Sequence, residues 1–436
     1  MSPSNHLPTF NMKVVVQETG LKPDTLRAWE RRYGVPNPER TPGGHRLYSQ
    51  HEIDLLKWLV ARQDEGMSIS HAVELWQQLE SEGQNPLLTM ETAVSETTLP
   101  NVTGEQVDEL REAWIEACLA FDEYRAQHLL ARAFALFSIE TVCYQVLQQG
   151  LNEIGEGWYE GTVSVQQEHF ASALALRQLE ALLVAMPAPT RNGRILVACP
   201  PTELHTFAPL MISLMLRRQG WDVVYLGANV PLERLEASVE QIKPQLVILS
   251  AQTLTAAGHT LPLAQKLAEL GVPLAFGGAV FNQIEQTVES IPGHFLGETL
   301  AQVPQTVEKL IQTTPAAGKA KKPGKAYQEA YKHFIERRSA IDAHLHVTPS
   351  LLEMPTALLS NTNKELSDNI EAALRLGDMA MVEANLDWVK GLLLSNHTRL
   401  TEALLQHYLQ QYHEAVKTVM DDEKAAPILD WFAQLD

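Results

Sequence analysis

The pattern of hydrophobic and polar positions divides the chain into segments of different character. In residues 12–80, short apolar stretches with helical spacing alternate with glycine, proline and capping residues, which is typical of a compact helical module. Two short helices joined by a turn at Gly20 are predicted there, and the second begins at Pro23, since the first helical turn tolerates proline. Turn residues between polar arms predict a short hairpin over residues 40–48. Two more helices are predicted, over about residues 50–63 and up to Leu79.

The spacing of apolar residues changes twice in the rest of the chain. Residues 104–186 keep a helical period and predict a bundle of four helices. Over residues 187–313, short apolar runs alternate with amphipathic helices, which predicts a parallel, doubly wound sheet. Residues 327–436 are again helical, and the polar stretches 81–103 and 314–326 are predicted to be linkers.

The predicted fold class is therefore multidomain. An all-α winged helix-turn-helix in residues 1–80 is followed by a helical bundle and a Rossmann-like α/β domain, and then by an all-α C-terminal extension. The length of 436 residues agrees with several domains, because single cores stop growing at roughly 250–300 residues.

Composition excludes several classes of protein. We expect a soluble cytoplasmic protein, because no charge-free stretch of about 18 apolar residues is present and the N-terminus lacks the apolar core of a secretory signal. The three cysteines are far apart and form no C-x-x-C pair, so neither a disulfide framework nor a thiolate metal site is indicated. We expect Cys118, Cys143 and Cys199 to be small buried residues.

The net charge of −19 is distributed unevenly along the chain. Residues 11–49 carry a net charge of +3, whereas residues 104–186 carry −9 and residues 326–436 carry −8. An acidic body repels phosphate, but a basic module at one end can still be held on nucleic acid.

The basic module carries a helix with arginines on one side. Arg27 and Arg31 are four residues apart and project from one face, where a major groove can accept them, while Leu26 and Trp29 face the core. The runs Thr25–Gly34 and Gly44–Tyr48 resemble the MerR-type winged-helix DNA-binding domain over residues 12–80. The resemblance implies a dimer on a palindromic operator, with DNA contacts from Thr25, Arg27, Arg31, Arg32, Tyr33, Arg40, His45, Arg46 and Tyr48.

Polar and small residues follow three of the predicted strands. Glu203-Leu204-His205 comes after the strand Arg194–Cys199, Ser250 and Thr253 lie at the end of the third strand, and Gly277-Gly278 end the fourth. In a doubly wound sheet, ligands bind beyond the carboxyl ends of the strands, so these residues predict one ligand site.

Residues 104–313 are similar to the cobalamin-binding module, which combines a helical bundle with a Rossmann-like domain. The resemblance implies that His205 ligates cobalt from the lower face and that Glu203 orients its second nitrogen. It also implies that Ser250, Thr253, Gly277 and Gly278 contact the nucleotide tail. Two positions depart from the family pattern, Ala208 where the module has glycine and Gln252 where it has leucine.

A tryptophan stands ten residues before a Glu-His pair, formed here by Trp158, Glu168 and His169. This spacing resembles that of the cobalamin-dependent photoreceptor repressors of the CarH and LitR type. The resemblance implies that these three residues enclose the adenosyl group of adenosylcobalamin. It further implies that a dark dimer or tetramer holds DNA and that light dissolves it.

The predicted function is therefore a cobalamin-binding, light-responsive transcription regulator without enzymatic activity. A regulator that senses cobalamin or another tetrapyrrole without photochemistry stays open, because Tyr159 stands where photoreceptors of this group place a histidine, and because of Ala208. A corrinoid methyl carrier is the alternative from the enzyme class, although it does not need a DNA-binding module. The C-terminal extension matches no family pattern, and three roles stay open for it: oligomerisation, docking of RNA polymerase or sensing of a second ligand.

Overall fold

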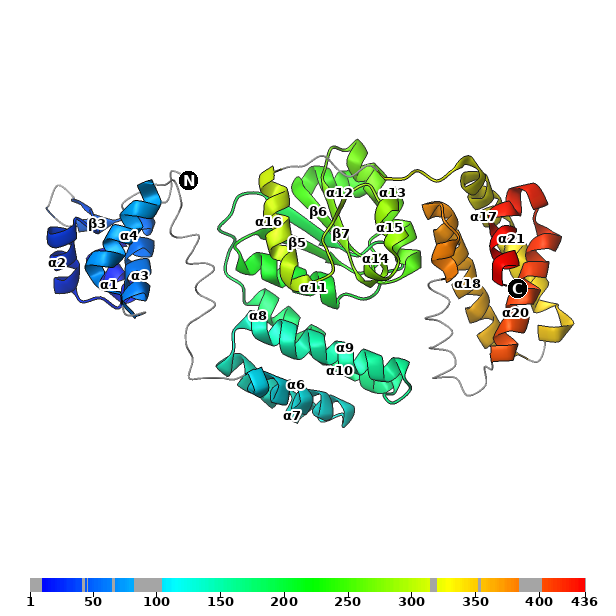
Figure 1. Ribbon diagram of the computed structural model, residues 1–436, viewed down its shortest axis with the longest axis horizontal. Helices are drawn as coiled ribbons and strands as arrows, with labels where there is room; N and C mark the ends of the chain where they lie inside the picture. Colours follow the sequence, from blue (N-terminus) through cyan, green and yellow to red (C-terminus); the bar gives the residue numbers. More distant parts are fainter. Residues whose placement is uncertain are drawn as a thin grey trace. The chain divides into compact units, whose positions relative to one another are not determined.

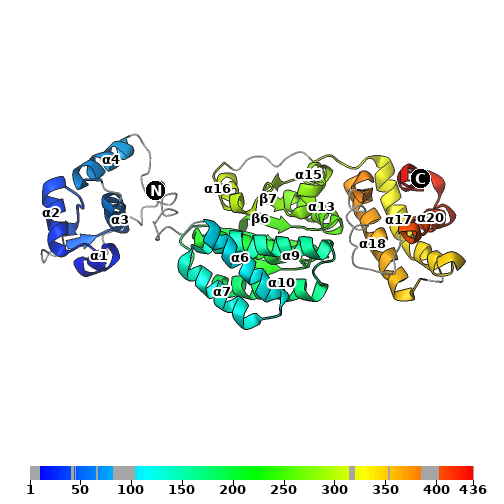
Figure 2. The ribbon, with the colours of Figure 1, turned by 60° about the horizontal axis from the view of Figure 1, so that its bottom comes forward.

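The computed structural model describes residues 10–40, 44, 46–64, 67–81, 104–313, 320–351, 354–383 and 402–435. The chain forms two compact units, Met1–Asn101 and Val102–Asp436, and both are drawn in two orientations in Figures 1 and 2. Among the described residues, no helix combines the length and apolar character that crossing a bilayer requires.

The first unit combines four helices with a small antiparallel sheet in its described part. Its elements are β1 (Phe10–Asn11), α1 (Met12–Thr19), α2 (Pro23–Tyr33), β2 (Glu39–Arg40), β3 (Arg46–Tyr48), α3 (Gln50–Asp64) and α4 (Ile69–Ser81). Strand β3 lies between β1 and β2. Gly20 and Gly34 end α1 and α2 in the left-handed conformation, which glycine adopts without steric cost. Leu26 and Trp29 of α2 are buried, as their spacing predicts.

The second unit begins with the helical bundle. It comprises α6 (Gly104–Leu119), α7 (Glu123–Leu136), a third segment and α10 (Val165–Val184). The third segment runs through α8 (Ile139–Thr141), the π-helical η3 (Val142–Gln148) and α9 (Gln149–Tyr159). A capping box at Ser164 and Gln167 starts α10. The helices pack around a core that contains the buried Trp114.

A five-stranded parallel sheet follows the bundle. Its strands are β4 (Arg194–Ala198), β5 (Asp222–Gly227), β6 (Pro244–Ser250), β7 (Leu274–Gly277) and β8 (His294–Phe295), in the order β5-β4-β6-β7-β8. Its helices are α11 (Phe207–Arg218), α12 (Leu235–Ile242), α13 (Leu254–Glu269), α14 (Ala279–Gln283), α15 (Glu285–Ser290), the 3-10 helix η4 (Leu300–Gln302) and α16 (Val303–Thr313). The parallel, doubly wound sheet predicted from the alternation of segments is confirmed, but β8 was not predicted.

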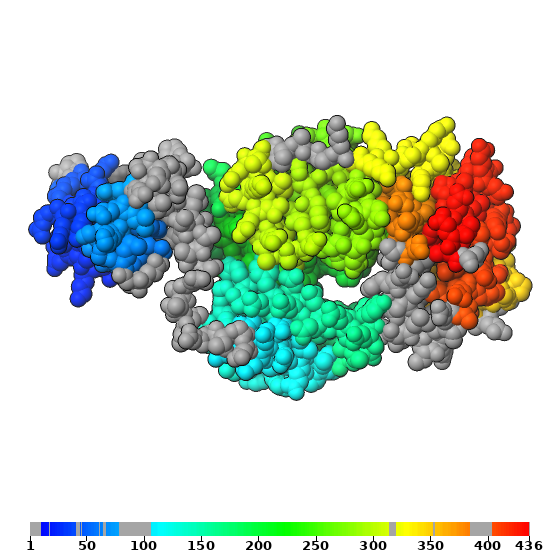
Figure 3. All heavy atoms as spheres, in the orientation of Figure 1, coloured from blue at the N-terminus to red at the C-terminus, as the bar shows by residue number. Residues whose placement is uncertain are grey.

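Successive side chains of each strand point to opposite faces of the sheet, and each face is covered by its own hydrophobic core. For this reason the strands are continuous apolar runs in the sequence. Ile195 and Val197 pack with α11 and α16 on one face of the sheet. Leu196 and Ala198 pack with α12 and α13 on the other face. The outer side of α11 then packs against the bundle, through Leu210 and neighbouring residues, and Figure 3 shows the atoms of bundle and sheet domain in contact.

The last part of the second unit is helical where it is described, with α17 (Lys325–His346), the 3-10 helix η5 (Pro349–Leu351), α18 (Thr356–Leu376), α20 (Glu402–Val419) and α21 (Asp422–Leu435). These helices share one hydrophobic cluster with α12 and α13, so they pack on the face of the sheet domain opposite the bundle. Helices α13 and α18 approach closely, because a Cβ added at Gly258 would lie 2.8 Å from the Cβ of Ala372. A buried hydrogen bond also joins the sheet domain to the C-terminal helices, because Ser290 Oγ of α15 donates to the carbonyl oxygen of Leu376 in α18. Helix α18 also contributes Arg375, which hydrogen-bonds to His259 of α13.

Candidate functional site

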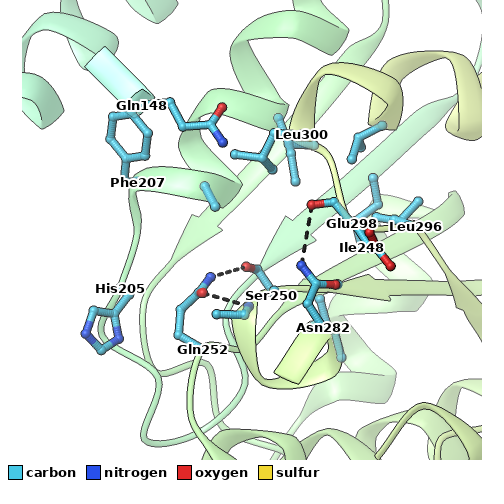
Figure 4. Close-up of a pocket in the computed structure, with 18 of the residues that line it drawn as sticks. Gln148, His205, Phe207, Ile248, Ser250, Gln252, Asn282, Leu296, Glu298 and Leu300 are labelled. Carbon is cyan, nitrogen blue, oxygen red and sulfur yellow. Dashed lines mark hydrogen bonds between the residues drawn. The ribbon is translucent and has the colours of Figure 1, made fainter. Parts of the chain in front are cut away.

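A cavity of about 430 Å³ lies between the carboxyl ends of the strands and the bundle. His205, Phe207 and Ala208 line it from the segment after β4, Ser250 and Gln252 from the end of β6, and Gly277 and Gly278 from the end of β7. Gln148, Leu151 and Asn152 line it from the bundle (Figure 4). Residues from all three strand ends thus line one cavity, and the bundle supplies part of its wall.

Glu203 and His205 form a fixed pair beside this cavity. The Glu203 side chain is fully buried, and its Oε1 accepts hydrogen bonds from His205 Nδ1 at 2.6 Å and from the His205 backbone N–H at 2.8 Å. Its Oε2 accepts a third hydrogen bond, at 2.5 Å, from the backbone N–H of Gln252. The imidazole therefore carries its hydrogen on Nδ1 and keeps Nε2 as its electron-pair donor. The His205 side chain is 67% exposed, so that Nε2 is open to a ligand.

The same contacts set the charges of the pair. Burial opposes ionisation of Glu203, but the hydrogen bonds from the His205 side chain and from two backbone N–H groups outweigh it and lower the pKa of the carboxyl. The hydrogen bond to Glu203 raises the pKa of His205. The charge of Glu168 in the bundle makes a smaller contribution to this rise of the pKa.

The ends of β6 and β7 are joined by the side chain of Gln252. Its Nε2 donates to Ser250 Oγ at 3.4 Å, and its Oε1 accepts from the backbone N–H of Ala279 at 2.9 Å, as the dashed lines in Figure 4 show. Ser250 is 2% exposed. The sequence marks Gln252 only as a departure from a family pattern and does not reveal this bridge between two strand ends.

Gly278 and Thr253 have structural tasks that the sequence does not reveal. Gly278 has a φ of 126°, and a Cβ there would lie 1.9 Å from the carbonyl oxygen of Ala251, so the close approach of β6 requires this glycine. Thr253 caps α13, since its hydroxyl accepts from the Ala256 N–H. Thr253 does not line the cavity, whereas Gly277 does.

The three residues predicted to enclose the adenosyl group, Trp158, Glu168 and His169, lie outside the wall of this cavity. Trp158 is half-buried at the end of α9 and packs against the bundle core. Glu168 accepts hydrogen bonds from Ser172 Oγ and pairs with His169 Nδ1, both at 2.6 Å. The His169 side chain is 75% exposed. The structure thus brings Glu203, His205, Ser250 and the two glycines together at the strand ends.

The predicted DNA contacts in the first unit differ in exposure. Arg27, Arg31 and Arg32 are exposed on α2, and Thr25 and Tyr33 are half-buried. His45 lies outside the described residues. Tyr48 is wrong as a DNA contact, because it belongs to the central strand β3, is fully buried and hydrogen-bonds to Met12 Sδ at 3.5 Å.

Two further predicted DNA contacts, Arg40 and Arg46, form salt bridges with Glu30, a residue that the sequence analysis did not single out. Glu30 of α2 accepts from Arg46 Nε at 2.7 Å and from Arg40 Nη2 at 3.4 Å. Because the arginines come from β3 and β2, Glu30 attaches the hairpin to α2. The Arg46 side chain is 24% exposed, and the hydrogen bond to Glu30 raises its pKa. The spacing of sixteen residues between Glu30 and Arg46 gives no local signal for this pair.

Comparison with known families defines the class of protein. Residues 10–79 match the MerR HTH family regulatory protein, residues 110–183 match a B12 binding domain family, and residues 193–299 match a second B12 binding domain family. The chain is therefore a DNA-binding transcription regulator with cobalamin-binding domains and not an enzyme.

Three of the relatives that the chain resembles are transcription regulators. The chain is 33% identical to the HTH-type transcriptional repressor CarH of Myxococcus xanthus over 294 residues, which cover 66% of this chain and 96% of CarH. It is 31% identical to the repressor CarA of the same organism over 56% of this chain and 76% of CarA. It is 32% identical to the regulator MlrA of Escherichia coli over 31% of this chain and 54% of MlrA. The chain belongs to the family of cobalamin-binding MerR-type regulators that includes CarH and CarA.

Proposed function

We propose that this regulator holds a corrinoid between the helical bundle and the sheet domain, with His205 as the cobalt ligand, and that the state of the corrinoid controls its hold on operator DNA. The observation that carries the proposal is the Glu203–His205 pair. A fully buried carboxylate holds Nδ1, which leaves a basic Nε2 open beside a cavity at the strand ends. Imidazole suits transition metals, and a carboxylate behind it raises its basicity as a ligand.

The domain boundaries form part of the proposal. Residues 1–80 act as the winged helix-turn-helix, with the β2–β3 hairpin as the wing, and residues 81–103 act as a linker. Residues 104–186 and 187–313 form the bundle and the Rossmann-like half of the cobalamin module. Residues 314–326 link them to a helical domain over 327–436.

DNA binding in this proposal rests on α2. The exposed Arg27, Arg31 and Arg32 face the operator, and Glu30 keeps the wing beside them. One small unit binds weakly, so several units tethered in a dimer or tetramer gain affinity together and lose it when the assembly separates. RNA polymerase is a further proposed partner.

We propose adenosylcobalamin as the natural corrinoid and light as the signal. When bound, it supplies a light-sensitive cobalt–carbon bond. Trp158 offers a flat indole to the adenosyl group, and Glu168 and His169 offer polar atoms to its ribose. The contribution of the Glu168 charge to the raised pKa of His205 supports this arrangement.

A second candidate is a regulator that senses cobalamin or another tetrapyrrole without photochemistry. Tyr159, half-buried beside Trp158, favours it, because a phenol is a poor replacement for an upper imidazole ligand. The cobalamin site and the DNA-binding unit are the same in both candidates.

One experiment separates these possibilities. The full chain is loaded with adenosylcobalamin in darkness, and its visible spectrum, elution volume and operator binding are compared before and after green light. The proposal expects all three to change. A spectral change alone favours the second candidate. Failure to retain any corrinoid contradicts the first candidate and leaves only the sensing of another tetrapyrrole from the second.

The His205→Ala variant gives the residue-level test. We expect it to lose most corrinoid retention, whereas His128→Ala, which removes an exposed histidine of the bundle away from the cavity, should retain corrinoid like the unaltered protein. Equal retention by both variants would contradict the assignment of the ligand.

A further inference from the structure

The half of α13 that lies nearest the cavity is covered on every side. From Leu254 to Ala264 no residue of this helix is exposed, whereas Gln265, Ala268 and Glu269 toward its end are exposed. A helix on a doubly wound sheet usually keeps an outer face in solvent. Here α18 of the C-terminal extension lies on that outer face and shares its hydrophobic cluster (Figures 1 and 2). The extension therefore encloses α13 where the helix begins.

The sequence of this half makes a weak helix by itself. Gly258 loses more backbone freedom on becoming helical than any other type of residue would. Pro262 has no backbone N–H, so the helix itself supplies no donor to the carbonyl oxygen of Gly258, four residues earlier. Thr255 and Thr260 are β-branched, which lowers the helix propensity further. The order of these turns therefore depends on the elements that pack around them.

The start of α13 is connected directly to the Glu203–His205 pair. The hydroxyl of Thr253 caps the helix by accepting from the Ala256 N–H. The preceding residue, Gln252, donates its backbone N–H to Glu203 Oε2 at 2.5 Å. Glu203 Oε1 in turn holds the imidazole of His205 at 2.6 Å. A shift in the first turns of α13 therefore displaces the backbone of Gln252 and, through it, the carboxylate that orients His205.

Helix α18 holds α13 at two adjacent residues within its first two turns. Gly258 approaches Ala372 so closely that a Cβ added at Gly258 would lie 2.8 Å from the Cβ of Ala372. At the next residue, His259 Nδ1 accepts a hydrogen bond from Arg375 Nη1 at 3.1 Å. Arg375 is itself held by Glu371 Oε1 at 2.8 Å. Undocking of α18 would remove both contacts from the turns that lead to the site.

We propose that the C-terminal extension regulates the corrinoid site: α18, docked on α13, keeps Glu203 in place behind His205, so that docking of the extension and binding of corrinoid favour each other. The inference rests on the proposed corrinoid site. Ala372 does not line the cavity and acts through α13, which makes it a positioning residue. Because coupling between two sites is reciprocal, bound corrinoid must hold the extension on α13 by the same factor by which docking tightens corrinoid binding.

Three variants separate docking from other effects of a substitution. Ala372→Leu places a larger side chain against Gly258 and forces α18 away from α13. Ala372→Ser keeps a small side chain, whose hydroxyl can donate to a carbonyl oxygen of the preceding turn, so α18 should stay docked. Ala343→Leu on α17 is the matched control, because it makes the same replacement at an exposed alanine of the extension.

The test measures the dissociation constant of each full-length variant for adenosylcobalamin in darkness. Circular dichroism and urea unfolding first establish that the variant is folded under the conditions of the titration. A variant that is less stable but still folded binds like the unaltered protein unless docking and binding are coupled, so this constant reports the coupling. We expect Ala372→Leu to raise the constant roughly fivefold or more, a typical coupling between sites. Ala372→Ser and Ala343→Leu should leave it unchanged.

Amide exchange of the unaltered protein gives the reciprocal measurement. Adenosylcobalamin should slow the exchange of those α18 amides that open when the helix undocks, and the same amount added to His205→Ala should not. If folded Ala372→Leu binds adenosylcobalamin as tightly as the unaltered protein, the inference is overturned while the proposed function stands. Should Ala372→Leu not fold, α18 exchange that is equal with and without adenosylcobalamin overturns it just as directly. If the unaltered protein does not bind adenosylcobalamin, the proposed function fails and the inference falls with it.

Discussion

Replacing Glu203 by glutamine should damage both the fold of the site and its affinity for corrinoid. The carboxylate accepts three hydrogen bonds at 2.5–2.8 Å, two on Oε1 and one on Oε2. Two of the donors are backbone N–H groups, which cannot reverse their role. A glutamine has one oxygen, so in either orientation its NH₂ group must face at least one of these N–H groups.

The expected size of the effect follows from these contacts. At least one buried hydrogen bond is lost and one donor is left unpaired, which costs about 1–3 kcal/mol of unfolding free energy. The imidazole also loses its charged partner, and such changes behind a metal ligand weaken metal binding roughly 10–100-fold. Glu308→Gln is the control, because its ion pair with Arg191 is partly exposed and is worth about 0–1 kcal/mol.

Urea unfolding of the apoprotein and spectrophotometric titration with corrinoid measure the two effects separately. We expect Glu203→Gln to lower both stability and affinity, and Glu308→Gln to leave the affinity unchanged. If Glu203→Gln binds corrinoid as tightly as the unaltered protein, then the orientation of His205 does not depend on this carboxylate and our reasoning is refuted.

Three further predictions concern the other parts of the chain. Gly258→Ala should lower the free energy of unfolding by about 1–3 kcal/mol, because the added Cβ meets α18. Gly155→Ala is the control: its added Cβ lies in open space, so it should raise the free energy of unfolding by up to about 1 kcal/mol. Urea midpoints that rise equally in both variants would contradict the docking of α18 on α13. Glu30→Gln should lower the free energy needed to open the β2–β3 hairpin by about 1–2 kcal/mol, which faster amide exchange in β3 would show. Unchanged protection of these amides would contradict the role of Glu30. Burial and the charge of Arg375 lower the pKa of His259, so the free energy of unfolding should be highest above about pH 6.5 and decrease at lower pH. His259→Gln should make this decrease less steep. An equally steep decrease in the variant would contradict the role of His259.

Local patterns explain which features were predictable from sequence. The helices of the first unit, the bundle and four of the five strands follow from periodicity, capping residues and glycine positions, which act over a few residues. The Glu203–His205 pair was also accessible, because the two residues are only two apart and sit at a strand end. Cys118, Cys143 and Cys199 are buried, as their type indicates.

Contacts between distant segments were not predictable in this way. Gln252 lies 49 residues from Glu203, and Glu30 lies 16 residues from Arg46. Tyr48 was misassigned because its side chain faces the core of the first unit. The strand that pairs with it, β1, has only two residues and is therefore hard to recognise in the sequence. The docking of the C-terminal helices depends on the fit of Gly258 against α18, which appears only once both helices are packed.

The cobalt ligand is the central claim, and electron paramagnetic resonance tests it most directly. The full chain is loaded with corrinoid, the cobalt is reduced to the paramagnetic cobalt(II) state, and the spectrum is compared for protein made with ordinary histidine and with ¹⁵N-histidine. A histidine ligand predicts that the nitrogen splitting of each cobalt line changes from a triplet to a doublet, and that His205→Ala loses this change. A triplet that persists with ¹⁵N-histidine would show that the nitrogen belongs to the corrinoid's own base and would contradict the account.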